Sequence, residues 1–184
     1  MKTILILISS ILLILPATRQ NMSVNNEKTQ LTIYGTSSIH DWHIEATNCK
    51  GGAVVQFEEG KFSTIEQLTF KVEVASLESG KSAMDDNTVE ALKGDKYPYI
   101  SYELTDISQA SGETFNTKGK LTIAGTTKIV NMKATITNSN KEISISGDIK
   151  FKMTDFKVDP PTAVFGTIKT GDEITIKFKT VYTI

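Results

Sequence analysis

Hydrophobic and polar residues alternate with a period of two along most of this chain. In one such run, Leu68, Phe70 and Val72 alternate with Thr69 and Lys71. Strict alternation of this kind indicates a β-strand with one apolar face and one solvated face. The pattern predicts about eight or nine strands, at residues 31–35, 39–46, 53–57, 68–74, 100–105, 118–124, 130–137, 143–153 and 174–179.

Short clusters of turn-forming residues separate these segments. They are Lys50-Gly51-Gly52, Glu58-Glu59-Gly60, Asn138-Ser139-Asn140 and Thr170-Gly171-Asp172. Glycine and asparagine allow the backbone conformations that tight turns need. Short strands joined by such turns are typical of an antiparallel barrel or sandwich, so we expect an all-β fold.

One segment follows a helical pattern instead. Ser82 and Asp85 have the spacing of a capping box, and Gly94 has the residue type that ends many helices. Between them, residues at helical spacing are Met84, Thr88, Ala91 and Leu92. We therefore predict a short helix at residues 83–93, connecting two strands and covering one end of a barrel.

The interior of such a fold has two interpretations. A barrel of about eight strands is just wide enough to be filled by side chains or to hold one small ligand. The inward positions would carry aliphatic and aromatic residues, so any cavity would be apolar and its ligand an elongated hydrophobic molecule. The same alternation also fits a sandwich whose core these side chains fill. Periodicity leaves both alternatives open.

The N-terminus has the layout of a secretory signal peptide. Lys2 precedes an apolar run at residues 4–15, and Pro16 and Ala17 follow it. The run is shorter than the ~20 residues that a transmembrane helix needs. We expect a signal peptide at residues 1–18, a flexible leader at 19–28 and the barrel domain at 29–184. The protein would then be periplasmic or secreted, with no membrane span after cleavage; an uncleaved N-terminal anchor is the alternative.

Composition excludes several classes of function. The chain has 20 basic and 21 acidic residues with no basic block, so it lacks the electrostatic footprint of a nucleic-acid-binding protein. Arg19 is the only arginine and precedes the expected domain, which therefore has no guanidinium for bidentate binding of a phosphate or carboxylate. Cys49 is the only cysteine, so no intramolecular disulfide can form.

His40, Asp41 and His43 are the only cluster with metal-ligand chemistry. On a strand, His40 and His43 point to opposite faces, and a zinc site would also need a third protein ligand. No serine lies in a nucleophile-elbow pattern. We therefore expect no metal, no cofactor and no catalysis. A metal-dependent enzyme built on this cluster remains an alternative.

Several motifs occur in a characteristic order. They are Ser37-Ser38-Ile39-His40-Asp41-Trp42, Lys96-Tyr97-Pro98-Tyr99-Ile100, Gly119-Lys120-Leu121-Thr122-Ile123-Ala124-Gly125-Thr126-Thr127-Lys128 and Gly147-Asp148-Ile149-Lys150-Phe151-Lys152-Met153-Thr154-Asp155-Phe156. In this order and spacing, residues 29–183 resemble the YceI-like family of bacterial periplasmic proteins. The resemblance implies a lipocalin-like, eight-stranded antiparallel barrel. It also implies an apolar interior that binds polyisoprenoid or other long amphiphilic lipids without catalysis.

The leading hypothesis is therefore a carrier for an isoprenoid or other amphiphilic lipid. The alternative is an envelope interaction module with a filled core and no ligand. The side chains expected to contact the lipid tail are Trp42, Phe70, Val72, Tyr102, Ile123, Met132, Ile145, Phe151 and Phe178. Trp42 is alternatively a buried structural anchor. For the head group we expect His40, Tyr97 and Tyr99, which carry hydrogen-bonding groups. The sequence is also compatible with a homodimer.

Overall fold

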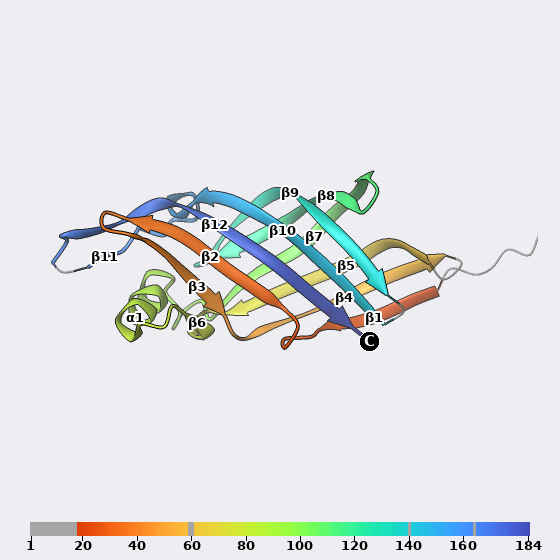
Figure 1. Cartoon of the computed structure of the whole chain (residues 1–184), viewed down its shortest axis with the longest axis horizontal. Coiled ribbons are helices and arrows are strands. Elements are labelled where there is room, and N and C mark those ends of the chain that lie inside the picture. Colours follow the sequence, from red (N-terminus) through yellow and green to blue (C-terminus); the bar gives the residue numbers. More distant parts are fainter. Residues whose placement is uncertain (1–17, 59–60, 140, 164) are drawn as a thin grey trace, which may run out of the picture.

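A computed structural model describes residues 18–58, 61–139, 141–163 and 165–184. Twelve strands and one α-helix follow one another within these ranges (Figure 1). The strands are β1 (Thr18–Val24), β2 (Gln30–Ser37), β3 (Asp41–Ala46), β4 (Cys49–Glu58), β5 (Lys61–Glu73), β6 (Leu77–Glu78), β7 (Tyr99–Ser111), β8 (Thr114–Ile123), β9 (Thr126–Ser139), β10 (Glu142–Lys152), β11 (Thr162–Ala163) and β12 (Ile168–Thr183). The helix is α1 (Ser82–Ala91), and the 3-10 turns are η1 (Val74–Ser76) and η2 (Met153–Phe156). The expected signal peptide falls almost entirely on residues 1–17, which lie outside the described residues.

Eleven strands form the barrel wall, but they make only eight antiparallel staves around it. Three of the staves each consist of two strands that follow one another along the stave. Strands β1 and β2 both pair with β12 and form the first of these double staves. The second consists of β4, which pairs with β1, and β3, which pairs with β2. The third consists of β5, which pairs with β4, and β6, which pairs with β3. Strands β7, β8, β9, β10 and β12 complete the ring. It closes where Ser23 and Val24 of β1 pair with Thr183 and Tyr182 of β12. The expected eight-stranded antiparallel barrel is therefore confirmed.

The breaks between the strands in line are bridged by side chains. Asn26, between β1 and β2, donates from Nδ2 to the carbonyl oxygen of Thr47 (2.8 Å) and accepts at Oδ1 from the amide of Cys49 (2.6 Å). The hydroxyl of Thr29 accepts from the amide of Val181 in β12 at 3.1 Å. These bonds satisfy backbone groups that the interrupted ladders leave without partners, so the wall continues through the break.

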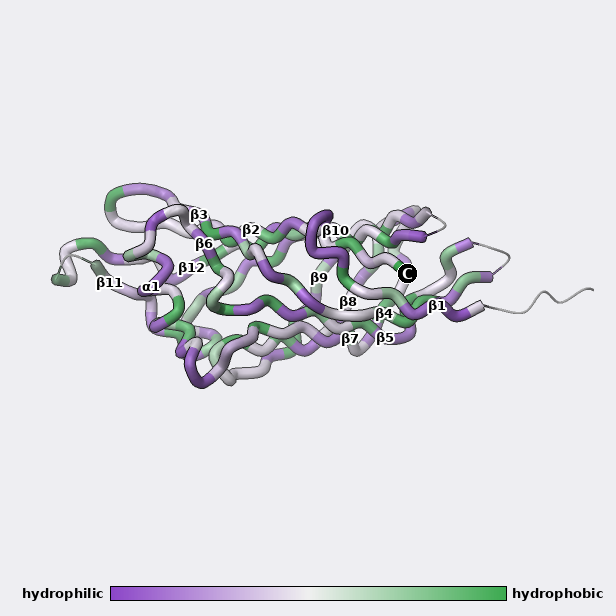
Figure 2. Tube along the Cα trace, turned by 90° about the horizontal axis from the view of Figure 1, so that it is seen from below, coloured by the Kyte–Doolittle hydropathy of each residue, from purple (hydrophilic) through white to green (hydrophobic). Residues whose placement is uncertain are grey.

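Strand β8 shows how the sequence pattern becomes a barrel wall. Its buried residues occupy every second position, and the polar residues between them face solvent. Figure 2 shows hydrophilic and hydrophobic residues alternating along several strands. The turn to β9 consists of Ala124 and Gly125, whose φ angles of 47° and 77° are both positive. A two-residue turn with positive φ at both residues is a type I′ turn, and its backbone twist matches the twist of the two strands that it joins.

The flexible leader expected at residues 19–28 is wrong in its first part, because residues 18–24 form β1. Six residues of β1 pair with β4, from Thr18 opposite Phe57 to Ser23 opposite Gly52. Met22, which is 3% exposed, is the only buried residue of the strand. Backbone hydrogen bonds and one apolar anchor therefore hold β1, and such a strand leaves no alternating pattern in the sequence.

Two of the expected turns lie inside strands. Gly51 and Gly52 belong to β4, and Gly171 belongs to β12 at a register shift in its pairing with β2. A Cβ atom at Gly51 would lie 2.1 Å from the carbonyl oxygen of Thr69 in β5. Glycine is needed at this position because the neighbouring strand approaches closely, and the chain does not turn there.

Helix α1 begins at Ser82, one residue before the expected start, and ends at Ala91. The predicted capping box of Ser82 and Asp85 is wrong, because Ser82 already lies within the helix. Asp85 Oδ1 instead accepts hydrogen bonds from the amide and the hydroxyl of Ser79, at 2.7 Å and 2.6 Å. The aspartate therefore fixes the loop that leads into the helix.

The C-terminal end of α1 also differs from the expectation. Lys93, not Gly94, takes the left-handed conformation, with φ of 54°. The amide of Gly94 donates to the carbonyl oxygen of Val89 at 2.8 Å, and a Cβ atom at Gly94 would lie 2.8 Å from Val89 Cγ1. Close packing therefore requires the glycine.

None of the helical segments in the described ranges reaches the length and hydropathy of a membrane-spanning helix.

The two ends of the barrel are packed differently. Away from α1, Phe57 and Phe115 are buried, and the rings of Phe62 and Phe115 meet edge to face with centroids 5.7 Å apart. Phe57 and Phe115 belong to the main hydrophobic core of the barrel and Phe62 packs against it, so side chains fill this end. Helix α1 covers the other end (Figure 1), and none of its residues is fully buried. The barrel therefore has a solid end and a loosely covered end.

Candidate functional site

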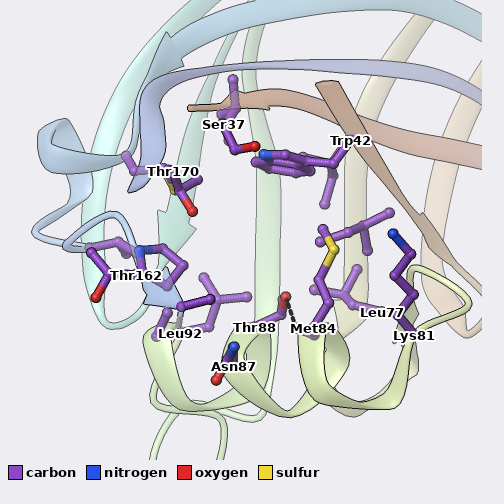
Figure 3. Close-up of a pocket in the computed structure, with 18 of the residues that line it drawn as sticks. Ser37, Trp42, Leu77, Lys81, Met84, Asn87, Thr88, Leu92, Thr162 and Thr170 are labelled. Atoms are coloured by element: carbon purple, nitrogen blue, oxygen red, sulfur yellow. Dashed lines mark hydrogen bonds between the residues drawn. The ribbon is translucent and has the colours of Figure 1, made fainter. Parts of the chain in front are cut away.

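A cavity of about 320 Å³ lies under α1 at the covered end of the barrel. Residues from β2, β3, β6, β12, α1 and η2 contribute to the lining of this outer cavity. Figure 3 shows Met84 and Thr88 of α1, and Leu92 directly after the helix, projecting into it, with Trp42 on the opposite wall. The three residues are spaced four apart along the helical path, which places them on one face. The Thr88 hydroxyl donates to the Met84 carbonyl oxygen at 2.8 Å, so it is satisfied within the helix.

The indole of Trp42 is held in place by a cross-strand glycine and one hydrogen bond. Trp42 in β3 pairs with Gly35 in β2, and a Cβ atom at Gly35 would lie 2.1 Å from Cζ2 of the indole. The indole nitrogen donates to the carbonyl oxygen of Thr36 at 2.9 Å. Trp42 is therefore both a fixed structural element and part of the outer cavity wall.

A second cavity, of about 110 Å³, lies deeper in the barrel. Strands β5, β7, β8, β9, β10 and β12 line this inner cavity. Ile100 and Ile176 line both cavities, so the two spaces are placed end to end. Together they extend from beneath α1 into the interior of the barrel.

Glycines also make room for aromatic rings in the inner cavity. A Cβ atom at Gly119 would lie 2.3 Å from Cζ of Tyr102. Gly147 is paired with Phe178, and a Cβ atom there would lie 3.1 Å from Cζ of that ring. Glycines on neighbouring strands therefore leave room for the rings of Tyr102 and Phe178, two of the aromatic side chains that line this cavity.

Charged groups are scarce around both cavities. Among the described residues that line them, none is an aspartate or glutamate, and the cationic candidates are His40 and Lys81 in the outer cavity. No lysine, arginine or histidine is among the described residues that line the inner cavity. A charged ligand group would be buried there without a partner, at a large cost in desolvation free energy.

The structure distributes the nine candidate tail contacts over the two cavities. Trp42, Ile123 and Phe151 line the outer cavity. The other six line the inner cavity: Phe70, Val72, Tyr102, Met132, Ile145 and Phe178. Sequence reasoning missed Lys81, Ile100 and Ile176 as lining residues. The alternation contained a signal for both isoleucines, whereas nothing local marks Lys81.

The three candidate head-group residues do not come together. His40 lines the outer cavity, whereas Tyr97 and Tyr99 line neither cavity. The ring of Tyr97 packs over Gly125, where a Cβ atom would lie 2.5 Å from the ring. Tyr99 is 40% exposed. Both tyrosines therefore point away from the space that a ligand could occupy.

The histidine cluster is divided between two environments. His40 Nδ1 lies 2.9 Å from the carbonyl oxygen of Asp41. His43 is exposed on β3, and the centroid of its ring lies 6.2 Å from that of Tyr34 on the neighbouring strand. Within the described residues, no group of three histidine, cysteine, aspartate or glutamate side chains is placed to hold a metal ion.

The outer cavity reaches the surface at the tips of two loops. Ile39, between β2 and β3, lines the cavity and is 62% exposed. Lys169 of β12 joins this loop to the β11–β12 hairpin: its carbonyl oxygen accepts from the Ser38 amide at 2.9 Å, and its amide donates to the Ser38 hydroxyl at 3.1 Å. Phe165, in that hairpin, is fully exposed. Apolar side chains therefore stand in solvent beside the cavity.

Cys49 is 3% exposed, and burial raises the pKa of its thiol from 9.0 to about 11. Between these values the unfolded thiol ionises while the folded thiol stays protonated, so the unfolded state binds fewer protons. The free energy of unfolding should therefore fall as pH rises from 9.0 to about 11. When denaturant unfolding is measured across this pH range, the free energy of unfolding should decline less steeply for Cys49→Ala than for the wild type. Identical pH dependence of the two proteins would contradict this account.

Comparison with known proteins identifies the fold and the family. The chain is similar to BcnA from Burkholderia cenocepacia, at 22% identity and a TM-score of 0.71, over 86% of this chain and 98% of that one. It is also similar to a polyisoprenoid binding domain from Saccharophagus degradans (11% identity, TM-score 0.70, 88% and 97%). A third similar structure is a YceI protein from Campylobacter jejuni (21% identity, TM-score 0.62, 77% and 84%). A search of curated proteins found no match.

The structural similarities, all below 25% identity, establish the fold of the barrel. The sequence itself carries the evidence for the family. The sequence model of the YceI-like domain matches residues 22–182, which span the barrel from β1 to β12. The chain therefore belongs to the YceI-like domain family.

Proposed function

We propose that the protein is a non-catalytic carrier that holds an isoprenoid or another long amphiphilic lipid along the barrel. The observation that carries this proposal is the pair of apolar cavities placed end to end and joined at Ile100 and Ile176. An extended hydrocarbon chain fits such a space. Each CH₂ group that it buries contributes about 0.8 kcal/mol, so affinity does not depend on salt bridges.

Two comparisons support this proposal. The domain from Saccharophagus degradans, which shares the fold, is described as a polyisoprenoid binding domain. Membership of the YceI-like family also favours a binding protein over an enzyme. The N-terminal sequence pattern supports a periplasmic or secreted location, which suits a protein that shields a lipid from water.

The charge distribution indicates how a lipid would be oriented. His40 and Lys81 both line the outer cavity, and each can donate a hydrogen bond to an oxygen of the ligand. We place a charged head group, where the lipid has one, in the outer cavity beside them. The chain then extends past Ile100 and Ile176 into the inner cavity, where no charge needs to be buried.

Native mass spectrometry of the mature protein, purified without added lipid, tests the function directly. Organic extraction should release an isoprenoid or similar amphiphile in stoichiometric amount, and the protein mass should show whether residues 1–18 have been removed. A ligand-free mass that stays unchanged after incubation with long-chain isoprenoids would reject the carrier. The filled-core interaction module would then be the better explanation.

Replacing Phe151 with lysine should weaken lipid binding by at least about 10-fold, because a cationic side chain would enter the apolar outer cavity. Occupancy after incubation with a long-chain isoprenoid can be measured by native mass spectrometry. The matched control is Ile129→Lys, since Ile129 is 52% exposed on β9 and lines neither cavity. Both variants should give the β-sheet circular dichroism of the wild type. Equal lipid occupancy of the two variants would remove Phe151 from the binding site.

A further inference from the structure

One hydroxyl group in the inner cavity has no hydrogen-bond partner. The oxygen of Tyr102 is buried, and no described residue forms a hydrogen bond with it. The other buried hydroxyls around this cavity are satisfied by backbone carbonyl oxygens. Thr117 donates to Met132 at 3.3 Å, Thr180 to Ile145 at 3.3 Å and Tyr182 to Thr69 at 3.2 Å.

The position of the Tyr102 side chain is well defined. Its ring rests on Gly119, where a Cβ atom would lie 2.5 Å from the phenol oxygen. Burial raises the pKa of Tyr102, and the nearby Thr117 hydroxyl offsets this only in part. The Thr117 hydroxyl lies close enough to influence the phenol, but it donates its hydrogen bond to the carbonyl oxygen of Met132. It forms no hydrogen bond of normal geometry with Tyr102. At neutral pH, Tyr102 is therefore a protonated donor.

We propose that the Tyr102 hydroxyl donates a hydrogen bond to an uncharged acceptor oxygen of the bound lipid, such as the carbonyl of a ketone, quinone, ester or amide. This inference rests on the proposed carrier function and narrows its ligand class. A buried donor without a partner is costly, and an acceptor oxygen on an otherwise apolar ligand would remove that cost. A phosphate or carboxylate is disfavoured at this position, because no described cationic side chain lines the inner cavity.

Competitive loading tests the proposal. Delipidated protein is incubated with equal amounts of a long-chain alkan-2-one and the n-alkane of the same length, and the retained lipids are extracted and quantified. Wild-type protein should retain the ketone in excess. In Tyr102→Phe the ratio of ketone to alkane should fall by about 5- to 10-fold, because the substitution removes only the donor. Tyr99→Phe is the matched control and should keep the wild-type ratio, since Tyr99 is 40% exposed and lines neither cavity.

The outcomes separate this inference from the carrier function. Retention of both lipids with the same ratio in wild type and Tyr102→Phe would overturn the role of Tyr102 and leave the carrier intact. Retention of neither lipid by wild-type protein would overturn both. A loss of selectivity confined to Tyr102→Phe would establish recognition of an uncharged oxygen inside the barrel.

Thermal unfolding of the delipidated proteins gives a second, independent readout. Tyr102→Phe should unfold at the wild-type temperature or above it, because the substitution removes a buried hydroxyl that has no partner. Tyr182→Phe should unfold at a lower temperature, because it loses the bond to Thr69. An equal decrease for both variants would show that the Tyr102 hydroxyl already has a partner in the empty protein, and would overturn the proposal.

Discussion

Replacing Tyr182 with alanine is expected to lower the free energy of unfolding by about 3–5 kcal/mol, the range for deleting a large buried side chain. Tyr182 is 1% exposed. It lies on β12 opposite Val24 of β1 and Ile143 of β10, at the place where the ring of strands closes. Its hydroxyl also reaches the carbonyl oxygen of Thr69 on β5. The side chain therefore connects strands that are distant around the ring.

Denaturant unfolding measures this effect, and Tyr182→Phe separates its two parts. The phenylalanine variant keeps the buried ring and loses only the hydrogen bond to Thr69, so it should cost about 0.5–1.5 kcal/mol. If the alanine variant costs no more than the phenylalanine variant, the ring does not hold the closure of the barrel together.

Replacing Gly35 with alanine is expected to displace Trp42 and to cost about 1–3 kcal/mol of stability, the usual range for overpacking. The new Cβ atom would lie 2.1 Å from the indole, far inside van der Waals contact. The indole ring must therefore move. It can do so by breaking its hydrogen bond to the carbonyl oxygen of Thr36 or by entering the outer cavity. Because Trp42 is the only tryptophan, a change in fluorescence emission reports the displacement directly.

Gly52→Ala is the matched control for this substitution. Gly52 also lies in a strand, but a Cβ atom there would have its nearest contact 3.4 Å away, at the carbonyl oxygen of Met22. We expect this variant to keep the fluorescence and, within about 0.5 kcal/mol, the stability of the wild type. Unchanged emission and lipid affinity in Gly35→Ala would show that the glycine does not position the indole.

The fold could largely be predicted from the sequence wherever a strand has one apolar and one polar face. Strands β8 and β10 follow the alternation closely, and β10 begins at Glu142, one residue before the expected start. Strand β1 could not be predicted in this way, since Met22 is its only buried residue. The reason for a glycine at position 51 could not be predicted either. It is the close approach of Thr69 in β5, which is distant along the chain.

The lining of the candidate site was predictable for a related reason. On each strand, alternation indicates which side chains face inward, and all nine candidate tail contacts line one of the cavities. The division into two cavities was not predictable, because it depends on how side chains from different strands meet in the interior, which alternation along one strand does not indicate. Tyr97 was expected at the head group because it carries a hydrogen-bonding hydroxyl, whereas its contact with Gly125 is set by tertiary packing.

The contrast between the two ends of the barrel has a consequence for how such a protein can diverge. Mutations in the aromatic core around Phe115 act on folding, because that end is solid. Mutations on the inner face of α1 act mainly on the outer cavity, because no residue of the helix is fully buried. In the proposed carrier, selection can therefore change ligand preference at one end of the barrel while the other end preserves the fold.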